Sequence, residues 1–164
     1  MVDREKKVFD HLELLNISYK LHRHPAVYTV PEAERLCGDI EGIHCKNLFL
    51  KNSKGNLHYL VVMKNSKRLD INRLSGEIGV GKLSFASEQR LEKYLGLEAG
   101  SVSPFGIIND TNKEVEVIID EDLIKKGELI NFHPNVNTAT LTITTEDFQY
   151  FLDKSGNKVR YLEV

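Results

Sequence analysis

Tryptophan is absent from this chain of 164 residues, and cysteine, methionine and proline are scarce, with two, two and four residues. The two cysteines, Cys37 and Cys45, lie eight positions apart and form no C-x-x-C pair. That spacing excludes a disulfide framework and a zinc site of the usual pattern. We therefore expect reduced, partly buried thiols, and no metal or other cofactor.

Long apolar runs are missing as well. No stretch of 18 apolar residues exists, and residues 1–7 lack the apolar segment that follows the basic start of a signal peptide. With 41% hydrophobic and 28% charged residues, the chain has the composition of an ordinary soluble domain. Such a chain buries roughly 68–70% of its unfolded surface around one core. These features predict one domain over residues 1–164, in the cytoplasm and without a membrane partner.

The chain also lacks a strong net charge. Its formal net charge of −2 argues against a protein that wraps nucleic acid through many phosphate contacts. The charge is nevertheless uneven. Residues 44–82 carry a local charge of +6, which leaves −8 for the remainder. The basic residues of this segment are Lys46, Lys51, Lys54, Lys64, Lys67, Arg68, Arg73 and Lys82. A small anionic end could dock here, and a solvated lysine-rich hairpin is the alternative that charge alone leaves open.

Apolar periodicity and capping signals predict a fold of many strands and fewer helices. Helices are expected at residues 3–15, 30–38, 70–75, 87–96 and from 145, and strands at 17–21, 46–50, 57–63, 82–85, 114–119, 128–132, 138–144 and 158–162. The strands outnumber the helices that could cross over between them. The sequence therefore predicts an α/β (α+β) fold, with a mixed, strongly curved, barrel-like sheet surrounded by helices.

The hairpin that begins near Lys46 is the clearest of these elements. A side-chain period of two places Lys46 and Leu48 on one face of the first strand, and Asn47 and Phe49 on the other. Lys46 thus heads an apolar face, and we expect it at the solvent edge of that face.

Residues 76–82 nearly match the phosphate-binding loop G-x-x-x-x-G-K-[ST]. Leu83 replaces the hydroxyl residue that would hold Mg²⁺, and a strand rather than a helix is expected after Lys82. A turn bent by glycine is therefore favoured over a nucleotide site, for which Mg²⁺-dependent ATP affinity would be the test.

A loop with several free amides is expected at residues 100–104. Gly100 can adopt a positive φ and Pro104 fixes the exit, so the N–H groups between them could turn around a carbonyl or hydroxyl oxygen. The preceding residues, Leu97 to Ala99, are expected to be exposed. A plain connecting loop is the alternative.

His133 has an unperturbed pKa of about 6.5, which suits proton transfer near neutral pH. No acidic residue lies beside it in sequence to orient the ring, so binding or gating is favoured over base catalysis. A serine hydrolase is disfavoured because no G-x-S-x-G elbow exists, and neither Ser101 nor Ser103 has a recognisable base. The water in any hydrolysis would have to be activated by another group.

Four segments, taken in order, resemble the YbaK and prolyl-tRNA synthetase editing-domain family, and the resemblance covers nearly the whole chain. The segments are residues 29–33, 46–50, 100–106 and 132–135. This resemblance implies a hydrolase that removes mischarged alanine from tRNA(Pro) in trans, with a ribose hydroxyl of the substrate assisting water and no metal. It also implies the tRNA acceptor end as a partner and a transient contact with prolyl-tRNA synthetase.

The resemblance assigns roles to individual residues. Lys46 would hold the phosphate of the terminal adenosine, and the loop would cradle the ester and ribose through Gly100, Ser101, Val102, Ser103 and Pro104. His133 would help limit the pocket, with Thr29, Asn47, Phe105, Gly106 and Asn135 as further substrate-binding residues. Two alternatives remain open: a cysteinyl-tRNA(Pro) deacylase, and a non-catalytic module that binds tRNA or a synthetase.

Overall fold

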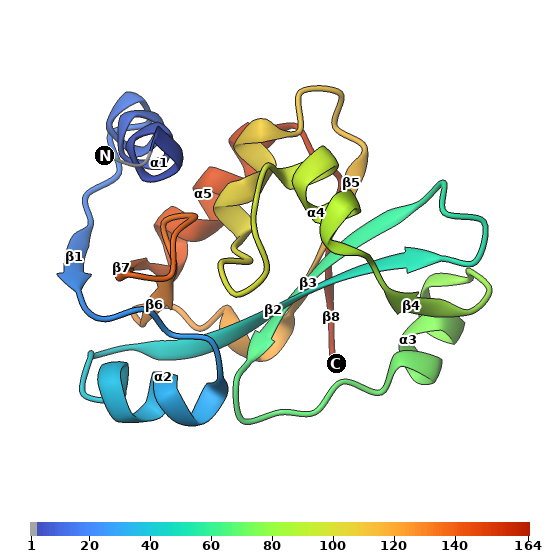
Figure 1. Cartoon of the computed structure of the whole chain (residues 1–164), viewed down its shortest axis with the longest axis horizontal. Coiled ribbons are helices and arrows are strands. Elements are labelled where there is room, and N and C mark those ends of the chain that lie inside the picture. The colour runs from blue at the N-terminus through green and yellow to red at the C-terminus, as the bar shows by residue number, and fades with distance from the viewer. Residues whose placement is uncertain (1–2) are drawn as a thin grey trace.

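Strands of both directions form one open, mixed sheet in the computed structural model, which describes residues 3–164 (Figure 1). The strands are β1 (Lys20–Arg23), β2 (Ile43–Asn52), β3 (His58–Lys64), β4 (Leu83–Phe85), β5 (Val115–Asp120), β6 (Leu129–Phe132), β7 (Ala139–Thr144) and β8 (Val159–Leu162). Their order is β1-β7-β6-β2-β3-β5-β8, with β4 paired to β2. The pairs β2/β6, β3/β5 and β5/β8 are parallel and the others antiparallel. The predicted mixed α/β fold is confirmed, although the sheet does not close.

The helices begin and end at the signals that the sequence carries. They are α1 (Asp3–Leu14), α2 (Val30–Cys37), α3 (Ile71–Ile78), α4 (Glu88–Leu95) and α5 (Thr145–Ser155), with 3-10 turns η1 (Pro104–Asn109) and η2 (Glu121–Leu123). Thr29, Asp70, Ser87 and Thr144 each accept a hydrogen bond from a backbone N–H of the first turn. Such caps satisfy amides that have no partner within the helix.

The longest strand, β2, joins the two parts of the sheet. Residues Cys45 to Lys51 pair with β3 along one edge. On the other edge, β2 pairs with β6 at Ile43 and His44, and with β4 only from Leu50 onward. This edge therefore has no neighbouring strand around residues 45–48, and a cavity lined by Cys45 and Asn47 lies there.

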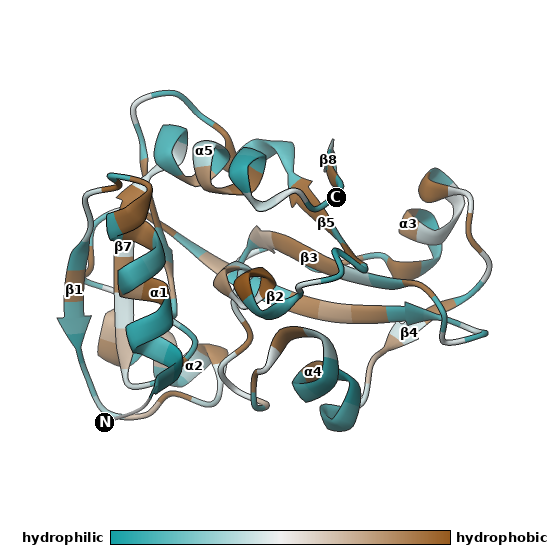
Figure 2. Ribbon diagram, turned by 90° about the horizontal axis from the view of Figure 1, so that it is seen from above, coloured by the Kyte–Doolittle hydropathy of each residue, from teal (hydrophilic) through white to brown (hydrophobic). Residues whose placement is uncertain are grey.

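Two apolar clusters pack on the two faces of the sheet, as the alternation along β2 predicts. Phe49 belongs to the larger cluster and Leu50 to the smaller one. Figure 2 shows hydrophobic residues concentrated in the central strands, with hydrophilic residues along α4 and α5. None of the helices within residues 3–164 combines the length and apolarity needed to cross a bilayer.

Local geometry around the glycine-rich segment agrees with the expectation of a turn. Gly76 lies within α3, Gly79 ends that helix with φ of 72°, and β4 begins at Leu83 directly after Lys82. The expectation for Leu97 is wrong, since this side chain is fully buried. It packs so closely on Gly106 that a Cβ there would lie 2.7 Å from its Cδ1 atom.

Candidate functional site

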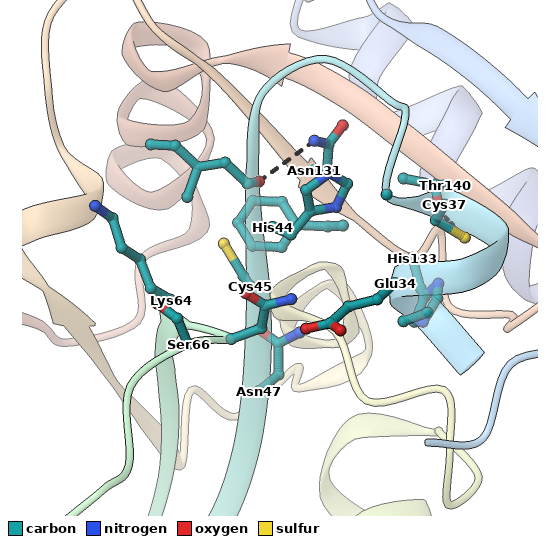
Figure 3. Close-up of a pocket in the computed structure, with 15 residues that line it drawn as sticks. Glu34, Cys37, His44, Cys45, Asn47, Lys64, Ser66, Asn131, His133 and Thr140 are labelled. Atoms are coloured by element: carbon teal, nitrogen blue, oxygen red, sulfur yellow. Dashed lines mark hydrogen bonds between the residues drawn. The ribbon is translucent and has the colours of Figure 1, made fainter. Parts of the chain in front are cut away.

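A cavity of about 450 Å³ opens between α2, the free edge of β2 and the end of β6 (Figure 3). This volume lies within the range of small-molecule sites. Its polar and thiol lining comprises Glu34, Cys37, His44, Cys45, Asn47, Lys64, Asn65, Ser66, Asn131, His133 and Thr140. The walls therefore come from segments that are up to about a hundred residues apart in the sequence.

Asn47 connects the cavity to the loop at residues 100–104. Its Nδ2 donates to the carbonyl oxygen of Val102 over 3.2 Å. Its Oδ1 is buried and has no hydrogen-bond partner within residues 3–164. A buried acceptor without a partner is costly unless a ligand or water satisfies it, so Asn47 presents a binding group to the cavity.

His133 follows β6 and offers a second acceptor. Its Nδ1 lies 3.0 Å from the carbonyl oxygen of Ala139, which can only accept, so Nδ1 carries the proton and Nε2 is left as an acceptor in the neutral ring. Burial lowers the pKa of His133 below its ordinary value, and the bond to Ala139 offsets part of this effect. The ring is thus neutral at pH 7 and forms both a wall and a polar contact.

The two thiols in the wall are poor nucleophiles. Burial raises the pKa of Cys45 far above its ordinary value, and burial also raises the pKa of Cys37. Since the thiolate is the reactive form, both groups are inert at neutral pH. They line the cavity as small, weakly polar surfaces, in agreement with the expectation of reduced, partly buried cysteines.

The lining carries one carboxylate and one amine. Glu34 extends from α2 across the cavity in the direction of Asn47, and Lys64 lies on β3 opposite Cys45 (Figure 3). Asn131 is occupied elsewhere, because its Nδ2 donates to the carbonyl oxygens of Glu41 and Ile43. Asn131 therefore holds the segment that leads into β2.

Part of the positive charge predicted for residues 44–82 is neutralised within the fold. Lys67 binds both Asp120, at 2.9 Å, and Asp122, while Arg73 binds Glu77 at 3.0 Å. Lys64 makes no such ion pair within residues 3–164. The charge available near the cavity is therefore smaller than the count of basic residues suggests.

The loop at residues 100–104 has the expected positive φ at its glycine, with a value of 85° at Gly100. Ser103 Oγ accepts from the amide of Phe105 and so begins η1. The amides of Val102 and Ser103 have no backbone acceptor in the described chain. None of the five residues, Gly100, Ser101, Val102, Ser103 and Pro104, lines the cavity; the loop reaches its wall through Val102 and Asn47.

Lys46 lies on the other face of β2 from Asn47. It is directly opposite Met63, which belongs to the smaller apolar cluster, and residues opposite each other in a pair share a face. Its side chain is half-buried and does not line the cavity. The expected position at the end of an apolar face is confirmed, but the structure does not bring Lys46 together with His133.

Four other predicted substrate contacts lie away from the cavity. The hydroxyl of Thr29 accepts from the amide of Glu32 and donates to its carboxylate, so Thr29 caps the N-terminus of α2. Phe105 is fully buried in the larger cluster, and Gly106 fits against Leu97. Helix capping and core packing engage these three positions, and their contact with substrate stays a prediction. Asn135 is also buried, with φ of 63° and both amide atoms unpartnered in the described chain.

Several wall residues escaped the sequence analysis. Glu34, Cys37 and Gly38 share one helical face at spacings of three and four, which the capping box at Thr29 would have allowed us to place. Lys64 could have been found from the hairpin register, which sets it opposite Cys45. Nothing in the sequence signals that α2 packs over this edge.

Comparisons with known proteins agree with this fold and show the family of the chain. The family described as aminoacyl-tRNA editing domain matches residues 24–151. The "Prolyl-tRNA editing protein ProX" of Acetoanaerobium sticklandii is 42% identical over 99% of both chains. "Prolyl-tRNA synthetase associated domain-containing protein 1" of Danio rerio is 34% identical over 94% of this chain and 84% of its own. A solved structure of a candidate trans-editing enzyme for prolyl tRNA synthetase has a TM-score of 0.74 at 23% identity, covering 100% of this chain and 99% of that one.

The chain belongs to the aminoacyl-tRNA editing domain family. Editing of an aminoacyl-tRNA is hydrolysis of the ester that joins an amino acid to the terminal ribose, so the class of the protein is aminoacyl-tRNA deacylase. The fold that the sequence resemblance implied is confirmed by the solved relative.

Proposed function

We propose that this chain removes alanine from mischarged tRNA(Pro), acting in trans as a separate editing protein. The observation that carries the proposal is the 42% identity, over 99% of both chains, to a protein named for prolyl-tRNA editing. A 102-residue match to "Proline--tRNA ligase" of Limosilactobacillus fermentum, at 29% identity, also supports tRNA(Pro) as the substrate. Residues 1–164 would form a single editing domain that works in the cytoplasm and meets prolyl-tRNA synthetase transiently.

The aminoacyl group would lie in the cavity between α2 and β2. The walls include Ala33 and Gly38 together with the ring of His133, which leave room for a small side chain. Rejection of larger amino acids would rest on steric exclusion at this wall. Glycine differs from alanine by one methyl group, which is worth about 1–3 kcal/mol, so discrimination against glycine should be weaker.

Hydrolysis would proceed by attack of water on the ester carbonyl carbon, with a ribose hydroxyl of the substrate assisting removal of the water proton. The C–O bond to the ribose breaks, and the ribose oxygen leaves with a proton. Protonated thiols at Cys37 and Cys45 and a capping role for Ser103 favour this route over a covalent intermediate. The loop does not line the cavity itself, so the amides of Val102 and Ser103 would stabilise the developing oxyanion only with the ester at the Asn47 end of the cavity. Each such donor is worth about 2.7–4 kcal/mol.

The tRNA acceptor end would approach from outside the cavity. Lys64 lines the cavity itself, while Lys46 could reach past the free edge of β2 on its four-carbon stem. We assign the phosphate of the terminal adenosine to Lys46, with Lys64 as the competing candidate. The remaining acidic surface would repel longer stretches of tRNA.

The test is incubation of the purified chain with alanyl-, cysteinyl-, seryl- and prolyl-tRNA(Pro), with ester loss followed against the uncatalysed rate. Rapid loss of alanine with prolyl-tRNA(Pro) left intact is the expected result. Preferential loss of cysteine would assign the chain to cysteinyl-tRNA(Pro). Tight acceptor-end binding without ester loss would make it a non-catalytic module.

A further inference from the structure

Three residues that line the cavity carry an acceptor with no partner in the described chain, and the first of them, Glu34, is exposed to solvent. The acceptors are the carboxylate of Glu34, the Oδ1 of Asn47 and the Nε2 of His133. Each comes from a different element, namely α2, β2 and the segment after β6, and Figure 3 shows Glu34 and Asn47 extending into the same space. Within residues 3–164, the Glu34 carboxylate makes no hydrogen bond or ion pair, although Lys64 lines the same cavity.

Two further polar groups of the wall, Asn131 and Thr140, are already engaged. The amide nitrogen of Asn131 donates to Glu41 and Ile43, and its oxygen accepts from Thr142. The hydroxyl of Thr140 lies 2.8 Å from Nε2 of His24. Figure 3 shows Lys64 and Ser66 on the other side of Asn47 from Glu34. The part of the cavity around Glu34 therefore offers a ligand acceptors with one negative charge.

A cationic donor is the complementary ligand. The α-ammonium group of an aminoacyl ester has one positive charge and three N–H donors, and charge-assisted hydrogen bonds are stronger than neutral ones. Neutral His133 and Asn47 can each accept one bond, and Glu34 supplies the opposite charge. No other cavity-lining residue in the described chain is acidic.

We propose that Glu34, Asn47 and His133 bind the α-ammonium group of the amino acid, so that the enzyme acts only on esters with a free α-amino group. This inference rests on the proposed function and deepens it. Because the carbonyl carbon is bonded to the α carbon, anchoring the ammonium also fixes the ester beside Asn47 and the loop that Asn47 holds through Val102. Peptidyl- and N-acylated aminoacyl-tRNA would be spared, since an acylated nitrogen has lost the positive charge and two of its three N–H donors.

The experiment compares alanyl-tRNA(Pro) with lactyl-tRNA(Pro), in which a hydroxyl replaces the ammonium at nearly the same size. Each rate is divided by the spontaneous hydrolysis rate of the same ester, because the ammonium also activates the ester chemically. The wild-type protein should prefer the alanyl ester by about 10- to 100-fold after this correction. Glu34→Gln should reduce the preference to within a few-fold of unity, chiefly by slowing the alanyl ester.

Glu32→Gln is the matched control on the same helix. The Glu32 carboxylate accepts from the Thr29 hydroxyl at the N-terminus of α2 and does not line the cavity, so this variant should keep the wild-type preference. Glu34→Ala serves as a second variant, and melting curves establish that each protein is folded.

Equal corrected rates for the two esters in the wild-type protein would overturn the inference. An unchanged preference in folded Glu34→Gln and Glu34→Ala would overturn it as well. Failure of the wild-type protein to hydrolyse alanyl-tRNA(Pro) would instead overturn the proposed function, and the ammonium site would fall with it.

Discussion

Replacing Gly100 by alanine should reduce turnover by straining the loop that contacts the cavity wall. Gly100 has φ of 85°, a conformation that costs an L-residue about 1–2 kcal/mol. An added Cβ would also lie 3.2 Å from Cδ1 of Tyr28, but that ring is 69% exposed and can move aside. Backbone strain at position 100 is therefore the main effect of the substitution. Position 100 is two residues from Val102, whose carbonyl oxygen accepts a hydrogen bond from Asn47.

Gly127 provides a matched control for this strain. Its φ is 82°, and an added Cβ would meet no atom within 4 Å. Gly127→Ala and Gly100→Ala should therefore lose similar stability, about 1–2 kcal/mol, which corresponds to roughly 2–8 °C in melting temperature for a chain of this size. Only Gly100→Ala should slow the hydrolysis of alanyl-tRNA(Pro).

The assay measures kcat and KM for alanyl-tRNA(Pro) together with the melting temperature of both variants. A lower kcat in Gly100→Ala, with wild-type kinetics in Gly127→Ala, is the expected outcome. Wild-type kinetics in both variants, at equal loss of stability, would refute the reasoning that the geometry of this loop supports catalysis.

Three further predictions concern charge and protonation. Lys46→Ala should stay folded and lose most deacylation. If Lys46→Ala keeps full activity and Lys64→Ala loses it, the phosphate contact belongs to Lys64 on β3 instead. Burial, assisted by nearby cations, lowers the pKa of His58 to about 4, so the unfolded chain binds the proton more readily and stability should fall as pH drops from about 6.5 to 4. His58 should contribute at most about 3 kcal/mol of this loss in urea titrations, and His58→Phe should lack that contribution; equal pH dependence in both proteins would contradict the assignment. Cys37→Ala combined with Cys45→Ala should keep deacylation within several-fold of wild type, whereas a loss of orders of magnitude would indicate a thiol nucleophile.

Local signals in the sequence were sufficient for most elements. Thr29 and Ser87 marked the starts of α2 and α4, Gly96 marked the end of α4, and alternating residues from Asn47 onward separated the two faces of β2. These features depend on interactions within a few residues, such as capping bonds and the two-residue period of a strand. The same reasoning correctly separated Asn47 from Lys46.

The cavity itself depends on contacts that the sequence does not encode locally. Parallel pairing brings Ile43 beside Ile130, and the packing of α2 over this edge completes the wall. Leu97 was expected at the surface together with Glu98 and Ala99, yet core packing with Gly106 buries it. Among the residues that the resemblance implied, Asn47 and His133 line the cavity, whereas Phe105 forms part of the apolar core.

The position of the aminoacyl group is best tested by a crystal structure with an adenosine that carries alanine through a 3′-amide, a bond that resists hydrolysis. The alanyl group should lie in the cavity between α2 and β2, with its ammonium near Glu34 and its carbonyl near Asn47 and Val102. Binding of the alanyl group on the opposite face of β2, beside Lys46 and away from His133, would contradict the assignment of this cavity as the editing site.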